Sequence, residues 1–226
     1  NFTTNTDSFN VAVGYTAGRE ITTGIDNTLI GGKAGIALTD ADENVAVGKG
    51  ALATDTLGSK SVAIGVGALN EQNFTTATNS YNTAVGHQAG KAVTTGVQNT
   101  LLGGAAGDAL TDADNNVAVG FAALTTETLG SHNTAVGYLT LSASNKTTAT
   151  NSYNTAVGSS AGANVTTGTL NTLIGGLAGD AMTTGDSNVA LGYNSLGGNT
   201  AGDHNVAIGI NALAVHNTSD SDNYNT

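Results

Sequence analysis

Asn44-Val45-Ala46-Val47-Gly48 is one copy of a five-residue motif that opens every repeat of this chain. The motif reads Asn, then Thr or Val, then Ala or Leu, then Val, Ile or Leu, and finally Gly; one copy begins with Ser. The copies are 17 residues apart, except that every fourth step is 21. They start at Asn10, Asn27, Asn44, Ser61, Asn82, Asn99, Asn116, Asn133, Asn154, Asn171, Asn188 and Asn205. A fixed period this short predicts a solenoid, in which each repeat stacks on its neighbours.

The repeats group into three blocks of about 72 residues, 10–81, 82–153 and 154–224, each with four coils. The first two coils of a block carry Ala-Gly beyond the motif, as at Ala34-Gly35, and the last two carry Leu, as at Leu52. This pattern indicates duplication of a four-coil cassette. Because residues 1–226 open and close inside a repeat, we expect one continuous β-solenoid segment of a longer protein.

Val45-Ala46-Val47 favours a short strand, because β-branched residues suit a pleated surface on which side chains alternate between faces. The glycine that follows marks a bend. We expect a second short extended stretch after it, through Ala51, and polar turns such as Thr22-Thr23-Gly24 that close the coil. Helix is disfavoured, because each glycine costs a helix about 1 kcal/mol. The predicted fold is therefore all-β, a parallel β-roll or β-helix of about twelve 17-residue coils.

Two residue types are expected to hold the repeats together. Stacked asparagines at the coil starts can form a hydrogen-bonded ladder that fixes the register between coils, and the glycine after each strand allows close backbone approach. The asparagine positions include Asn27, Asn44, Asn82, Asn99, Asn116 and Asn133, and the glycine positions include Gly31, Gly48, Gly86, Gly103, Gly120 and Gly137.

The amino-acid composition argues against several classes of protein. Pro, Cys and Trp are absent and aromatics are 4%, so large side chains are too few for an ordinary globular core. The net charge of −11 argues against nucleic-acid binding, which needs Lys and Arg to displace counterions. The basic residues Arg19, Lys33, Lys49, Lys60, Lys91 and Lys146 form no cluster in the sequence. No apolar run approaches the roughly 20 residues of a membrane-spanning helix, so membrane insertion is not expected.

Every fourth coil is longer, and its extra residues, in 70–81, 142–153 and 214–224, are expected to protrude. These loops and the amino-terminal stem each contain an Asn-x-Ser/Thr triplet, which is an N-glycosylation acceptor in a host that has the pathway. The candidates are Asn1, Asn73, Asn145 and Asn217, and a further triplet starts at Asn164. The alternative is chance, because Asn and Thr are abundant and duplication copies such triplets.

Metal binding has only sparse candidates. Asp40 and Asp42, like Asp112 and Asp114, lie two apart on predicted turns, where their oxygens suit Ca²⁺. The third block does not keep this pair, and solvated turn acids are the competing interpretation. The histidines, at positions 87, 132, 204 and 216, have no metal-ligand spacing and are interpreted as turn residues.

No enzymatic site or cofactor is predicted. Gly158-Ser159-Ser160-Ala161-Gly162 matches the nucleophile pattern of serine hydrolases, but it occupies the same frame as Gly14–Gly18 and so belongs to the repeat. A polysaccharide-active β-helix enzyme would need a carboxylate cluster, and none recurs in all three blocks. The aromatic residues of the sixth coil place could stack on sugars if they point outward. We favour packing at the end of the roll or at a seam between chains for Tyr15, Phe121, Tyr138 and Tyr193.

The copies Asn44–Gly48, Ser61–Gly65 and Asn133–Gly137 resemble the head repeats of trimeric autotransporter adhesins of the YadA type. The 17-residue form with a closing Thr-Thr-Gly is similar to repeats of bacteriophage tail-fibre and appendage proteins. The resemblance implies a left-handed parallel β-roll, often a homotrimer, in an extracellular or virion setting. The preferred hypothesis is the shaft of an extracellular fibre, such as a phage tail fibre that projects a host-binding tip. The alternative is a bacterial adhesin or secreted filament, possibly glycosylated. Expected partners are other copies of the chain and a cell-surface glycan or receptor.

Overall fold

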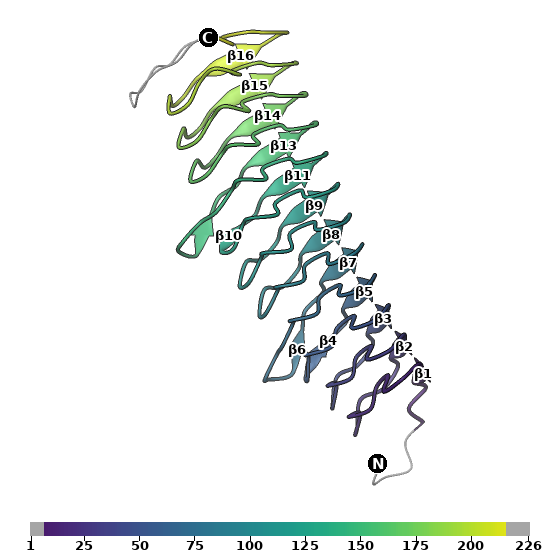
Figure 1. Ribbon diagram of the computed structural model, residues 1–226. Coiled ribbons are helices and arrows are strands. Elements are labelled where there is room, and N and C mark those ends of the chain that lie inside the picture. Colours follow the sequence, from purple (N-terminus) through teal and green to yellow (C-terminus); the bar gives the residue numbers. More distant parts are fainter. Residues whose placement is uncertain (1–6, 216–226) are drawn as a thin grey trace. The chain divides into compact units, whose positions relative to one another are not determined.

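A computed structural model describes residues 7–215. The described residues contain strands and turns but no helix, and the fold is a β-solenoid of twelve coils, as predicted. They divide into two compact units, one ending at Ala113 and the other beginning at Asp114. Each unit holds six coils that are stacked in sequence order (Figure 1).

One parallel sheet runs through each unit, with one three-residue strand per coil. In the first unit the order is β1 (Val11–Val13), β2 (Thr28–Ile30), β3 (Val45–Val47), β5 (Val62–Ile64), β7 (Thr83–Val85) and β8 (Thr100–Leu102). In the second unit it is β9 (Val117–Val119), β11 (Thr134–Val136), β13 (Thr155–Val157), β14 (Thr172–Ile174), β15 (Val189–Leu191) and β16 (Val206–Ile208). Equivalent positions pair in every case, as Val45 does with Val62.

The longer coils add a second, two-stranded parallel sheet to each unit. Strand β4 (Gly58–Ser59) pairs with β6 (Thr78–Asn79) in the first unit. Strand β10 (Gly130–Ser131) pairs with β12 (Thr150–Asn151) in the second. Figure 1 shows the loop at β6 reaching beyond the adjacent coils of its unit, and beside β10 the loop that carries its partner β12 does the same in the second unit. The predicted loops 70–81 and 142–153 therefore protrude as expected. The third predicted loop, 214–224, lies almost wholly outside the described residues.

The core is a narrow column of small and medium aliphatic side chains. In the three-residue strands from β2 onward the middle residue is buried, and Leu29 and Ala46 are examples with no exposed surface. Small and large core residues are matched within a coil and between neighbouring coils. An added Cβ at Gly35 would lie 2.7 Å from Leu29 of its own coil, and one at Gly90, whose coil has the small Ala84, would lie 2.6 Å from Leu101 of the next coil. The alternation of Ala-Gly and Leu coils is therefore a volume match between stacked layers.

The extended stretch expected through Ala51 is wrong: residues 49–52 form turns. Two residues of this segment, the seventh and ninth of each coil, have left-handed backbones, as at Lys33 (φ 63°) and Leu52 (φ 51°). This conformation costs a non-glycine residue roughly 1–2 kcal/mol. It is offset here by hydrogen bonds between coils: Lys33 N–H donates to the preceding coil at Tyr15 (2.8 Å), and Leu52 N–H donates to the following coil at Ala68 (3.0 Å).

Candidate functional site

An asparagine ladder runs through each unit. Oδ1 of Asn27 accepts the backbone N–H of Asn44 at 3.0 Å, and Nδ2 of Asn27 donates to the carbonyl of Ala41 at 2.7 Å. One buried side chain thus ties a coil start both to its own closing turn and to the next coil. The Oδ1 contact recurs from Asn10, Asn44, Asn82, Asn116, Asn133, Asn154, Asn171 and Asn188.

A glycine column follows the strands. Gly48 has φ 134°, and a Cβ built on it would lie 2.5 Å from the carbonyl oxygen of Gly65 in the next coil. The same conflict with the next glycine arises at Gly31, Gly86, Gly120 and Gly137. Both the backbone angle and the absence of space require glycine here. The glycines and asparagines named from the sequence therefore occupy architectural positions.

A second ladder, which sequence reasoning missed, lies two residues before each coil start. Oδ1 of Asp42 accepts the N–H of Ile25 at 2.8 Å, and the N–H of Asp42 donates to Ser59 Oγ at 2.9 Å. In the second unit Oδ1 of Asp203 accepts the N–H of Asp186 at 2.7 Å. The available signal was the recurrence of Asp or Ser at this place, 17 residues apart.

The calcium candidates take part in these contacts between coils. Asp42 belongs to the second ladder, as does Asp114, whose N–H donates to Ser131 Oγ at 3.0 Å. Oδ1 of Asp112 accepts the hydroxyl of Thr95 at 2.6 Å, and Asp40 accepts that of Thr23. Within residues 7–215 the structure brings together no group of three or more His, Cys, Asp or Glu that could hold a metal ion.

The glycosylation candidates differ in exposure. Asn145 is exposed on the second-unit loop, whereas Asn73 is partly buried on the first-unit loop. The hydroxyls of Thr128 and Thr56 donate to their Oδ1 atoms, at 3.1 and 3.4 Å. Asn164 is exposed and donates to the carbonyl of Asp180 at 2.7 Å. Asn1 and Asn217 lie outside the described residues.

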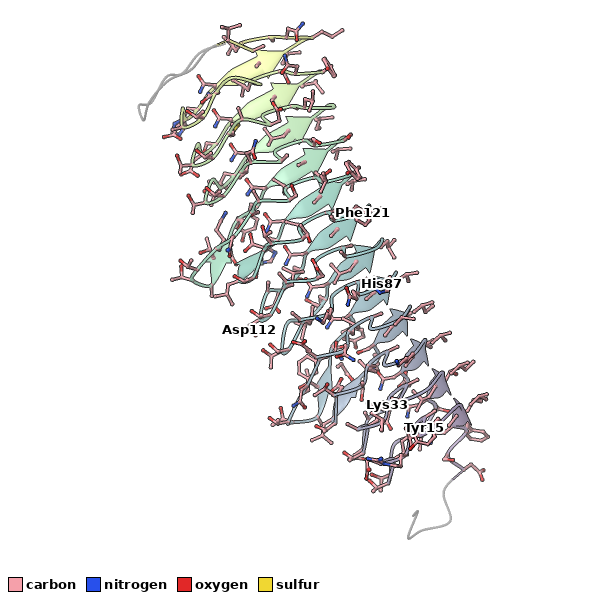
Figure 2. All side chains as sticks on the ribbon, in the orientation of Figure 1. Tyr15, Lys33, His87, Asp112 and Phe121 are labelled. Carbon is pink, nitrogen blue, oxygen red and sulfur yellow. The ribbon has the colours of Figure 1, made fainter. Side chains whose placement is uncertain are left out.

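The aromatic residues of the sixth place lie on the surface, so packing at the end of the roll is wrong for them, and packing at a seam between chains stays a prediction. Tyr15 is 78% exposed, and Phe121, Tyr138 and Tyr193 are more than half exposed. Phe121 and Tyr138 stack on each other with ring centroids 5.9 Å apart. Figure 2 shows His87 at the strand side of its coil and Asp112 at the opposite turn edge. His132 stacks on Tyr153 at 4.9 Å, and His216 lies outside the described residues.

Each unit also buries an acidic side chain beneath its long loop. In the first unit Asp55 has no exposed surface. Its Oδ1 accepts the N–H groups of Gly58 and Phe74, both at 3.0 Å, and its Oδ2 accepts Nε2 of Gln72 at 2.6 Å. Gln72 also donates to Ser61 Oγ at 2.8 Å, so the network replaces the ladder asparagine at the one coil that begins with Ser.

The second unit places Glu127 at the equivalent position. Oε1 of Glu127 accepts the N–H groups of Gly130 (2.8 Å) and Lys146 (2.9 Å), and Oε2 accepts Ser144 Oγ (2.5 Å). The Lys146 ammonium donates to the carbonyls of Thr166 and Gly168, at 3.0 and 3.2 Å. Burial lowers the pKa of Lys146, and the attraction of Glu127 and then of Asp186 acts in the opposite direction. Sequence reasoning singled out neither acid, since nothing local marks them as buried.

Three of the five lysines gather in the structure, although the basic residues form no cluster along the sequence. Lys33, Lys49 and Lys91, half of the six basic residues, line one groove of about 430 Å³ in the first unit. They come from the second, third and fifth coils, and stacking brings them together. Among the described residues that line the groove none is acidic. No ion pair between described residues involves these three lysines.

The described residues include no helix that is long and apolar enough to span a membrane. Comparisons with family models, with curated proteins and with solved structures find no match to this chain.

Proposed function

We propose that this chain is part of the shaft of an extracellular fibre, a phage tail fibre or appendage that projects a host-binding tip, and that it self-associates as a homo-oligomer. The observation that carries the proposal is the outer face of the sheet. The third residue of each strand is Val, Ile or Leu and points outward, so each unit displays an aliphatic row that a single chain leaves uncovered.

In the first unit Ile30 is 40% exposed and Ile64 is 38% exposed, and Leu102 continues the row. In the second unit the row includes Ile174 and Leu191, at 38% and 44%. A continuous apolar surface of this kind is typical of an association surface rather than of a monomer exposed to water. Burial against identical rows of two further copies would give a trimer.

The contacts between coils support a mechanical role. Short strands pair from coil to coil, and side chains of the two ladders add hydrogen bonds at many of these steps. These contacts satisfy backbone donors that a three-residue strand alone would leave unpaired. In such a solenoid each coil contacts mainly its neighbours, so the position of one coil fixes the position of the next. This property suits a spacer.

Sedimentation of the purified chain tests self-association. We expect the wild-type chain to sediment as a trimer. The double variant Ile30→Glu with Ile64→Glu should be a monomer, because it places two charges in an apolar interface. Thr75→Glu with Ala77→Glu, on the exposed loop, is the matched control and should leave the oligomer intact. A wild-type chain that is monomeric at micromolar concentration would overturn the proposed self-association. A separate experiment, labelling of virions with an antibody to the chain, tests whether the chain is part of a phage fibre.

A bacterial adhesin or secreted filament is the second candidate, and the exposed Asn145 on a protruding loop favours it. Its test is the mass of the native protein before and after removal of glycans. Excess mass that maps to Asn145 and Asn73 would support the glycosylated filament, whereas a mass equal to that of the polypeptide would favour the phage fibre.

A further inference from the structure

The lysine groove of the first unit has the composition of a site for an anion. Lys33 and Lys49 are exposed and Lys91 is half-buried, and the three residues line one groove together with Asn70 and Gln88. Three cations that form no ion pair with residues 7–215 raise the local positive potential in a chain whose net charge is −11. Such a concentration of one charge inside an oppositely charged protein attracts an anionic ligand to that place.

Two glycines open the groove, and neither is required by the fold. Gly50 (φ 67°) and Gly67 (φ 69°) occupy the seventh coil place, where Gln88 has a left-handed backbone without being glycine. An added Cβ would meet only a side-chain atom, of Asn70 at 3.3 Å or of Gln88 at 3.6 Å. This contrasts with the glycine column, where the conflict is with backbone. The two glycines therefore provide open space rather than a turn.

The equivalent positions 72 residues later carry none of these features, although the coils there are the same. Phe121 and Tyr138 hold the positions of Lys49 and Val66, and they stack. Leu139 holds the position of Gly67 and has φ 51°. The equivalents of Lys33 and Lys91, residues 105 and 163, are both Ala. The shared architecture thus does not demand the groove, and its cations and its space occur where the first block meets the second and not at the equivalent place 72 residues later.

We propose that this groove binds a short acidic oligosaccharide through its carboxylate or sulfate groups. A space of about 430 Å³ suits a ligand of a few sugar units. The lysines supply charge, and Gln88 supplies an amide for sugar hydroxyls. Val66 is the one large aliphatic side chain among the described lining residues, so the groove offers little to anchor a peptide. The acidic surroundings repel a long polyanion such as nucleic acid.

The test is titration calorimetry of the full chain with three hexasaccharides: an oligogalacturonate, a heparin-derived fragment and neutral maltohexaose. We expect one or both acidic sugars to bind, more weakly as salt rises, and maltohexaose not to bind. Binding of the galacturonate alone identifies carboxylate as the recognised group, and binding of the heparin fragment alone identifies sulfate. This proposal does not rest on the fibre role, because it concerns the isolated chain.

Two variants test the location of the site. Lys33→Ala with Lys49→Ala should weaken binding at least about tenfold, whereas Arg19→Ala with Lys60→Ala removes the same charge elsewhere and should change affinity less than about twofold. Gly67→Leu fills the groove without changing charge and adopts the residue of the next block, so it should fold and lose binding. Absence of binding by both acidic sugars, equal loss in the control pair, or full affinity in Gly67→Leu would overturn the proposal.

Discussion

The two long coils solve the same problem with different side chains. Beneath the first loop lie Asp55 and Gln72, and beneath the second lie Glu127 and Ser144, at equivalent positions. The shorter acid, Asp55, pairs with the longer side chain of Gln72, and the longer acid, Glu127, pairs with the shorter side chain of Ser144. In both cases the carboxylate accepts backbone N–H groups of its own turn and of the loop above. The two units therefore keep the same combined side-chain length of acid and partner, and the carboxylate satisfies the equivalent backbone donors in both.

The two buried pairs differ in the residues that surround them. In the first unit Phe74 covers the network and the coil starts at Ser61, whose hydroxyl contacts Ser80 at 2.5 Å. In the second unit Lys146 takes the place of Phe74, and Asn133 restores the ladder. A duplicated coil therefore tolerates exchange of apolar for charged residues at a buried place when the new group finds its own acceptors.

Removal of either acid should have the largest effect. Asp55→Ala and Glu127→Ala each leave at least two buried N–H groups without an acceptor, and we expect a loss of about 3 kcal/mol or more of unfolding free energy in each case. Urea unfolding of the full chain measures the loss, and hydrogen exchange should place it at β4 and β6 or at β10 and β12. Asp40→Ala, at an exposed acid, should cost less than about 1 kcal/mol. Losses no larger than this control would contradict a supporting role for the buried acids.

Exchange of the pairs tests the length match. Asp55→Glu alone adds a methylene to a closed network and should cost about 1–3 kcal/mol. Addition of Gln72→Ser and Ser61→Asn, which copies the second unit, should recover most of that loss. The measured quantity is the coupling free energy in a mutant cycle, expected to be about 1 kcal/mol or more. Additive costs would mean that the two lengths are independent.

The stacked rings of Phe121 and Tyr138 provide a second comparison between blocks, with a smaller expected effect on stability. Phe121 and Tyr138 should show a coupling of about 0.5–1.5 kcal/mol in a double-alanine cycle, because stacked rings interact beyond their buried area. The equivalent cycle at Lys49 and Val66 should give a coupling near zero. Equal couplings in the two cycles would argue that the stack adds nothing to stability.

The smallest expected effect concerns pH. Because burial lowers the pKa of Lys146 in the folded protein, the unfolded chain binds more protons between that value and the ordinary lysine pKa of 10.5. Stability relative to Lys146→Met should therefore rise with pH through this window and level off above it. Urea unfolding from neutral to alkaline pH measures the difference. Phe74→Met is the control and should leave the slope of the wild type unchanged; a flat difference for Lys146→Met would show that its charge is not penalised.

Much of the fold could be predicted from periodicity. A spacing of 17 or 21 residues, an apolar triplet and a following glycine predict a strand at the start of each coil, and the structure confirms the solenoid, although the second extended stretch expected in each coil is a turn. The left-handed turns could not be predicted, because Lys33 and Leu52 carry no local signal for that backbone. Hydrogen bonds to neighbouring coils select it, and those bonds exist only after stacking.

The sequence by itself determined the repeat, the glycine column and the positions of the ladder asparagines, because each depends on a spacing that is read along the chain. Only the tertiary structure decided which acids are buried and which lysines meet. Asp55 resembles any turn acid until the loop above it closes, and Lys33, Lys49 and Lys91 are distant in sequence until three coils bring them to one groove. Burial and charge density are properties of stacked layers, and no single coil contains them.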